Sequence, residues 1–185
     1  MSGIHHMLVH FPLGFWTLAS LMILVGSFSN GRLAEISREA VLPVLVLSLL
    51  AAAITIASGF LVWPVEAALS SPLARNHILT ALWSLGVFVM LTILVWRAGS
   101  NAFDGVRRLV LVVLALTGMS IFATTGTIGG HLVGATTEFS EVLKLFGWDV
   151  YNTFYVPIWV VALLVLIGLM CAVAGLLSRR SNSTT

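Results

Sequence analysis

Five histidines are the residues of this chain whose types and spacing allow chemistry. His5, His6 and His10 stand close together near the N-terminus, and His77 and His131 follow much later. His6 and His10 are four residues apart, so on a helix both side chains point from one face. A neutral imidazole nitrogen is a ligand for haem iron, copper or zinc. The pattern predicts a cofactor or metal site if the fold brings these histidines together.

The composition is that of a membrane protein. Of the 185 residues, 59% are hydrophobic and 9% are charged, and the mean hydropathy is +1.07. Soluble domains carry about 25% charged residues. The net charge of +2 without a basic tract excludes nucleic acid as a partner, and the single Cys171 excludes an intrachain disulfide, a cysteine-bound iron–sulfur cluster and a c-type haem. We expect no removed signal peptide, because a basic segment and a cleavage site are both missing from the start.

Five apolar stretches are long enough to cross a bilayer, which takes roughly 20 residues. The predicted spans are residues 8–28, 41–63, 77–96, 109–130 and 153–177. Pro12, Pro43 and Pro157 are expected in first turns, where a missing N–H does no harm. An apolar period over residues 137–147 predicts a short interfacial helix between the fourth and fifth spans. We therefore expect a single all-α membrane domain, a four-helix bundle with an additional fifth span.

Lysines and arginines predict how the chain is oriented. Seven of the nine fall on one side of the predicted spans: Arg32, Arg38, Arg97, Arg107, Arg108, Arg179 and Arg180. Only Arg75 and Lys144 fall on the other side. Since short cytoplasmic loops are rich in positive charge, the N-terminus is predicted outside and the C-terminus inside. All five histidines then lie near the outer face, on three different spans.

A haem between helices is the cofactor that this placement favours. A b-type haem needs two imidazole ligands on facing helices and an apolar slot for the ring. The expected ligands are His6, His10, His77 and His131, with His10 the foremost, while His5 is expected to be an interfacial residue in water. Gly14, one turn from His10, and Gly130, next to His131, are expected to leave room for the ring. Polar side chains expected nearby are those of Ser58, Thr80, Ser84, Thr124 and Thr125.

The stretch HMLVHFPLG resembles the opening of a bacterial membrane family, domain of unknown function 2231, whose members begin H-P-x-x-V-H-F-P-[IL]. Met7 is taken to stand where that family has proline. Residues 129–133, GGHLV, resemble its closing element, and Arg75-Asn76-His77 resemble the start of its third span. The resemblance covers residues 5–135, implies four spans and singles out His6, His10, His77 and His131. Its members occur beside c-type cytochrome modules, which implies a redox setting.

The function expected is that of a multi-pass electron-transfer subunit in a bacterial inner membrane. It would bind one or two b-type haems near the outer face and pass electrons between membrane quinol and a c-type cytochrome or dehydrogenase subunit. We expect a subunit of an oxidoreductase complex rather than a stand-alone enzyme, because the seven carboxylates lie in loops and no catalytic motif is visible. One alternative is a copper or zinc protein that uses the same histidines. The other is a structural subunit of a larger complex.

Overall fold

The computed structural model describes residues 2–182, and side chains for residues 3–177. The described chain is helical with loops and contains no strand. Its five long helices are α1 (Ser2–Phe28), α2 (Arg32–Val62), α4 (Pro72–Ala98), α5 (Gly105–Leu132) and α7 (Ile158–Asn182). All five are long and apolar enough to cross a membrane. The predicted all-α fold with five spanning helices is confirmed, and the chain is a multi-pass membrane protein.

Three short elements connect the long helices. The helix α3 (Val65–Ser70) links α2 to α4, the 3-10 helix η1 (Gly99–Phe103) links α4 to α5, and α6 (Phe139–Leu145) follows α5. Helix α6 lies within the predicted interfacial segment and buries Ser140 and Leu143. Neither α3 nor η1 is predicted by the apolar pattern of the sequence.

The long helices extend beyond the apolar stretches from which they were predicted. Helix α1 begins at Ser2 instead of residue 8, and α2 begins at Arg32 instead of residue 41. Hydropathy measures only the part that matches the bilayer, whereas leucine, alanine, glutamate and arginine continue a helix into the interface. Helix α7 instead begins at Ile158, five residues later than predicted, directly after Pro157. Arg179 and Arg180, which count toward the orientation, have side chains outside the described part.

Pro12 and Pro43 therefore lie in the interiors of α1 and α2, not in their first turns. Proline has no N–H, so the carbonyl of Leu8, four residues before Pro12, loses its usual helical partner. The hydroxyl of Thr55 on α2 lies 3.1 Å from this carbonyl oxygen and donates to it as well as to the carbonyl of Ala51. In lipid, where water cannot replace a lost partner, such a contact ties α2 to α1.

Four of the long helices form the bundle. Helix α1 packs chiefly against α2, and α4 packs chiefly against α5. The two hairpins meet through the pairs α2–α4 and α1–α5. In this arrangement α1 and α4 are diagonal, and so are α2 and α5. Residues on α1 and α4 that point inward therefore face each other across the bundle axis.

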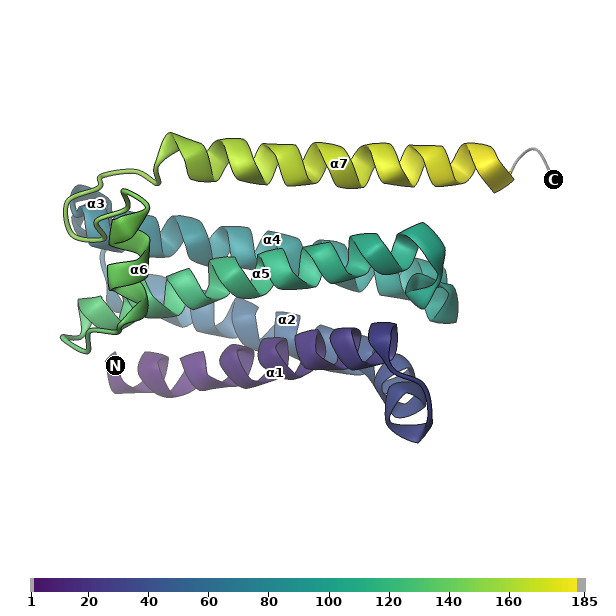
Figure 1. The fold of residues 1–185 in the computed structure, drawn as a ribbon. Helices are drawn as coiled ribbons and strands as arrows, with labels where there is room; N and C mark the ends of the chain where they lie inside the picture. The colour runs from purple at the N-terminus through teal and green to yellow at the C-terminus, as the bar shows by residue number, and fades with distance from the viewer. Residues whose placement is uncertain (1, 183–185) are drawn as a thin grey trace.

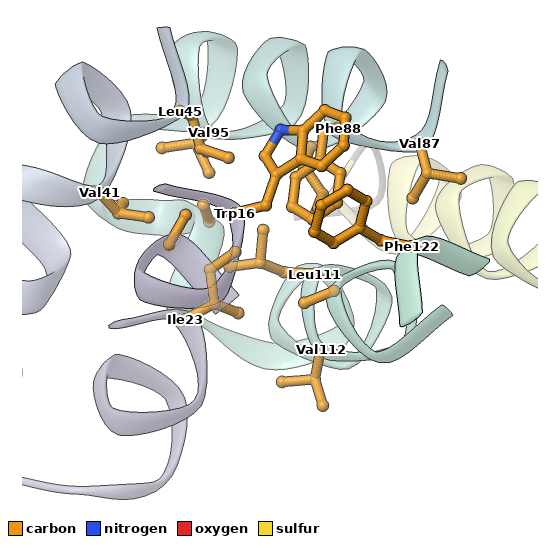
Figure 2. Packing of buried hydrophobic residues seen from close by; sticks show 14 of the residues in the cluster. Trp16, Ile23, Val41, Leu45, Val87, Phe88, Val95, Leu111, Val112 and Phe122 are labelled. Carbon is orange, nitrogen blue, oxygen red and sulfur yellow. The ribbon is translucent and has the colours of Figure 1, made fainter. Parts of the chain in front are cut away.

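Aromatic rings fill the middle of the bundle (Figure 2). Trp16 of α1 stacks on Phe88 of α4, with ring centroids 4.5 Å apart and planes 7° apart. Phe122 of α5 meets Trp16 edge to face at 4.6 Å. Such ring pairs add about 0.5–1.5 kcal/mol each beyond the area that they bury. This stack packs α1, α4 and α5 together in the middle of the bundle, between the end that carries the histidines and the opposite end.

Helix α7 lies along the outside of the bundle (Figure 1). No residue of its most apolar stretch is buried against the rest of the described chain. Val160 and Leu164 are the α7 side chains that pack against the two buried clusters. The rest of the helix faces lipid, so α7 adds a span without adding to the interior.

The histidines gather at one end of the molecule. Figure 1 shows the start of α1, α3 and α6 at this end and the last turn of α7 at the other. The starts of α1 and α4 and the finish of α5 lie here, because the four bundle helices alternate in direction. His5, His6 and His10 belong to α1, His77 to α4 and His131 to α5.

Candidate cofactor site

A cavity of about 290 Å³ opens inside the bundle at the histidine end. Its walls come from all four bundle helices and from α3. Apolar side chains make up most of the lining, with Trp16 and Phe122 on the side of the aromatic stack and Trp63 at the end of α2. Two of the five histidines line it, His5 and His77. Since they belong to diagonal helices, they reach this space from opposite sides of the bundle.

The proton of His77 is placed by its hydrogen bond. The Nδ1 atom lies 3.1 Å from the carbonyl oxygen of Thr125 on α5. A carbonyl oxygen only accepts, so Nδ1 carries the proton and donates it. In the neutral ring this leaves Nε2 with a free lone pair. Ligating histidines usually have this arrangement, in which a backbone carbonyl orients the ring through its other nitrogen.

His5 adopts the same tautomer as His77, and its hydrogen-bond partner is a serine. Its Nδ1 atom lies 2.9 Å from Oγ of Ser58. The single hydroxyl proton of Ser58 goes to the carbonyl of Thr55, 2.7 Å away. With that proton on the Thr55 carbonyl, Oγ accepts from His5; in this tautomer the proton lies on Nδ1 and Nε2 again keeps its lone pair. Within the described residues, neither His5 nor His77 has a hydrogen-bond partner at Nε2.

Each of the two rings rests on a glycine of the neighbouring helix. A methyl group built on Gly59 would lie 3.0 Å from Cε1 of His5, and one on Gly129 would lie 2.9 Å from Cε1 of His77. Both distances are too short for ordinary carbon contacts, so any larger residue would push the rings away. Glycine at these two positions is what admits the imidazoles.

The matching surroundings reflect an internal repeat of the helix hairpin. His77 follows His5 by 72 residues, and Phe88 follows its stacking partner Trp16 by the same number. On the second helix of each hairpin, Gly129 follows Gly59 by 70 residues. The same shift of 70 relates five pairs of buried positions, Val41 and Leu111, Leu45 and Ala115, Ser48 and Gly118, Ala52 and Phe122, and Thr55 and Thr125. His5 and His77 are thus equivalent residues of two similar hairpins.

His6 and His10 lie elsewhere. The side chain of His10 is exposed, and its Nδ1 bonds to the carbonyl of His6 on the same helix at 2.9 Å. His6 is half-buried, and its ring is T-shaped to that of Trp63, with ring centroids 6.1 Å apart. Neither lines the cavity. His5, expected in water, is instead only 7% exposed.

His131 is buried but does not line the cavity. Its Nδ1 lies 2.6 Å from the hydroxyl of Tyr151, in the loop before α7. Its Nε2 is buried and has no hydrogen-bond partner in the described chain. The bond joins the finish of α5 to the loop.

The two glycines expected to form the slot lie away from it. A methyl group on Gly14 would meet nothing within 4 Å, so this position faces outward. A methyl group on Gly130 would lie 2.5 Å from the carbonyl oxygen of Ala135. Gly130 therefore lets the chain turn back after α5, and its carbonyl accepts from the amide of Ala135 at 2.9 Å.

The four histidines expected as ligands do not form one cluster. In the part of the chain that the structure describes, no group of three or more histidine, cysteine, aspartate or glutamate side chains lies close enough to share a metal ion. The structure brings together a pair, His5 and His77. The sequence predicts Ser58 and Thr125 as neighbours of the site, but Gly59 and Gly129 were not predicted. The repeated T-x-x-x-G of residues 55–59 and 125–129 was the signal that could have found the glycines.

Comparison with known proteins gives one match. A family model described as "Predicted membrane protein (DUF2231)" matches residues 2–137, which include the whole cavity and exclude α6 and α7. No curated protein and no solved structure matches the chain.

Proposed function

The chain belongs to the DUF2231 family of predicted membrane proteins, and we propose that it is an electron-transfer subunit that binds a b-type haem between His5 and His77. The haem would lie at the histidine end of the bundle. It would pass electrons between quinol in the membrane and a redox partner outside, a c-type cytochrome or a dehydrogenase subunit. The protein then acts as one subunit of an oxidoreductase complex.

One observation carries this proposal. Two neutral imidazoles on diagonal helices, each with its proton held at Nδ1, line one apolar cavity with their Nε2 lone pairs free. A b-type haem takes its axial ligands from such nitrogens in helix bundles.

The number of ligands favours haem over a bare metal ion. A structural zinc site uses four protein ligands and a catalytic site three. The porphyrin brings four nitrogens of its own, so iron needs only two more from the chain. The residues present fit this demand, since His5 and His77 are the two histidines that line the cavity.

The lining of the cavity fits an apolar ring, whereas its volume requires the surrounding side chains to move apart around a haem. Its volume of about 290 Å³ is close to the lower limit of small-molecule sites, about 300 Å³. The lining includes flat aromatic surfaces and no lysine, arginine, aspartate or glutamate. A planar apolar ligand would gain contact with these walls and would displace little bound water.

The residues of the chain would position and insulate the group. Haem supplies the reversible one-electron chemistry when bound. Ser58 and the Thr125 carbonyl hold the two rings in the ligating tautomer, which raises the basicity of each Nε2. Trp16 and Phe122 close the inner side, and Trp63 covers the end beside His5, with ring centroids 5.3 Å apart. Low polarity around the site would set the redox potential.

An opening toward lipid suits exchange with a membrane quinol. Phe60, Trp63 and Leu82 line the cavity and are also 39–45% exposed. Phe60 lies on α2, Trp63 directly follows it and Leu82 lies on α4, so the cavity reaches the bundle surface between these helices. A quinol could approach from the bilayer there, while a partner outside would approach the loops at the histidine end.

Haem content of three alanine variants tests the proposal. The protein would be made in a bacterium that synthesises haem and purified in mild detergent, and a reduced-minus-oxidised spectrum would give haem per chain. His5→Ala and His77→Ala should each lower haem content or affinity by more than about tenfold. His10→Ala should match the wild type, because its ring points away from the cavity.

Other outcomes would contradict the haem site. Full haem in the His5 and His77 variants would remove both from the ligand set. Stoichiometric copper or zinc without a Soret band would favour a metal protein. A wild-type protein that carries neither haem nor metal would favour a structural subunit.

A further inference from the structure

A second cavity, of about 560 Å³, lies at the other end of the bundle. It is bordered by the α1–α2 loop and by the connection between α4 and α5. Its lining is polar and contains two arginines, Arg38 and Arg108. They are 70 residues apart, the shift that relates α2 to α5 in the repeat. Each hairpin therefore contributes one arginine from the equivalent position.

Arg38 is held in a fixed position. Its Nε donates to the carbonyl of Gly26 at 2.8 Å, and its Nη2 donates to the carbonyl of Ser29 at 3.1 Å. The guanidinium carbon lies 5.9 Å from the centroid of the Phe103 ring. Nη1 has no hydrogen-bond partner among the described residues. One edge of the guanidinium is thus bound to carbonyls at and just after the end of α1, and its Nη1 group remains free to donate.

Ser27 provides an independent sign of a missing ligand. The residue is 5% exposed and lines this cavity. Its Oγ is buried and has no hydrogen-bond partner within the described residues. A buried hydroxyl without a partner destabilises the folded chain, because it loses the hydrogen bonds that it made to water. A ligand with oxygen atoms would supply that partner.

The helices that begin here add positive potential. Both α2 and α5 start at this end, and neither start is capped by a side chain of the described chain. Free N–H groups and the helix dipole favour an anion near a helix start. Arginine donates two parallel bonds to phosphate oxygens, which makes it the usual phosphate ligand. Asp104, also on the lining, would repel a bare anion but accepts hydrogen bonds from hydroxyl groups.

We propose that Arg38, Arg108 and Ser27 form a binding site for a phosphate ester whose alcohol part carries hydroxyl groups. Two sources share this chemistry, the headgroup of an acidic phospholipid and a soluble phosphate ester. The positive-inside rule places this end in the cytoplasm, where anionic headgroups bind basic pockets between spans. The site lies at the end opposite the histidines, so it does not depend on the haem proposal.

Native mass spectrometry of the full chain in a neutral detergent tests the lipid source. Phosphatidylglycerol would be added in one series and phosphatidylcholine in another. We expect retention of phosphatidylglycerol only, and Arg108→Gln should weaken it by about tenfold, as expected for the loss of one charge-assisted contact. Arg107→Gln is the matched control, since it removes the same charge one residue earlier at a side chain that does not line the cavity.

A thermal-unfolding assay tests the soluble source. Glycerol phosphate should raise the unfolding midpoint of the wild type and of Arg107→Gln, relative to chloride at equal ionic strength, and leave Arg108→Gln unchanged. Ser27→Ala is a second variant, which leaves the charge unchanged. It should lower the affinity for whichever of the two ligands binds. Binding in either assay that depends on Arg108 supports the site and identifies its source. The proposal would be overturned if Arg107→Gln and Arg108→Gln weakened ligand binding equally, or if the wild type bound no ligand in either assay.

Discussion

Two glycines give the cavity histidines the space that they occupy. Because the Cβ positions of Gly59 and Gly129 lie within 3.0 Å of the imidazole Cε1 atoms, even alanine would displace the rings. Overpacking of this kind costs typically about 1–3 kcal/mol. Ligation by both Nε2 atoms depends on their exact positions, so it would be lost when the rings move by less than such a methyl group requires.

We therefore predict that Gly59→Ala and Gly129→Ala insert normally and lose most of the haem absorbance. Gly14→Ala and Gly126→Ala are the controls, since a methyl group at either position meets nothing within 4 Å. These controls should keep the wild-type spectrum and gain slightly in helix propensity. Equal spectra for all four variants would show that the rings near Gly59 and Gly129 hold no cofactor.

At this scale, the sequence predicted that the histidines lie at one end of the bundle, but not which of them line a cavity. The depth of a histidine along a predicted span does not tell which face of the helix it occupies. Because α1 begins at Ser2, His5 shares the inward face with Pro12, Trp16, Ala19 and Ile23. The pattern H-P-x-x-V-H-F-P, counted back from His10-Phe11-Pro12, also puts its first histidine at His5 and its proline at His6. Placing the proline at Met7 was wrong by one residue.

Among the elements, the four bundle helices and α7 have different roles. The family match covers α1 to α5 and stops before α6. Helix α7 buries almost nothing, and the cavity takes no residue from it. In a bilayer, lipid tails can replace the few apolar contacts of a peripheral helix at little cost.

We predict that a chain ending at Pro157 still folds and binds haem. Its haem content should equal that of the full chain, and its unfolding midpoint should fall by about 5 °C or less. A truncation that also removes the loop containing Tyr151 is the informative comparison, because it breaks the 2.6 Å bond to His131. Loss of haem on removal of α7 alone would mean that the fifth span supports the site.

The number and approximate positions of the spanning helices followed from hydropathy, because crossing lipid demands long apolar helices. The helix termini did not, since polar residues at the interface continue a helix without changing hydropathy. The repeat was missed because it lies in a few small and aromatic residues, such as the Leu-Gly pairs at 13–14 and 85–86. At most lipid-facing positions the α1–α2 and α4–α5 hairpins carry different residues, which makes the repeat hard to detect in the sequence.

At the scale of the whole molecule, the two ends of the bundle differ in chemistry. The paired histidines line the cavity at one end, and the paired arginines line the cavity at the other. If the arginine end is cytoplasmic, the proposed haem lies near the outer face, and electrons need not cross the membrane.

A periplasmic reporter tests this orientation. Fusions at the N-terminus or between residues 133 and 137 should be active, because positive charge keeps the arginine end inside. Fusions between residues 99 and 104 or at the C-terminus should be inactive. The reverse pattern would place the histidine cavity in the cytoplasmic half and would remove an outer cytochrome as the partner.

The central claim is that two imidazoles, one from each hairpin, ligate one haem. The spin state of the oxidised wild-type protein, recorded by electron paramagnetic resonance, tests it most directly. Two imidazole nitrogens impose a strong field on ferric iron, so we predict a low-spin signal that persists without added ligands and is lost in His5→Ala and His77→Ala. A high-spin signal from the wild type would mean that an axial position is open, and it would contradict ligation by the His5–His77 pair.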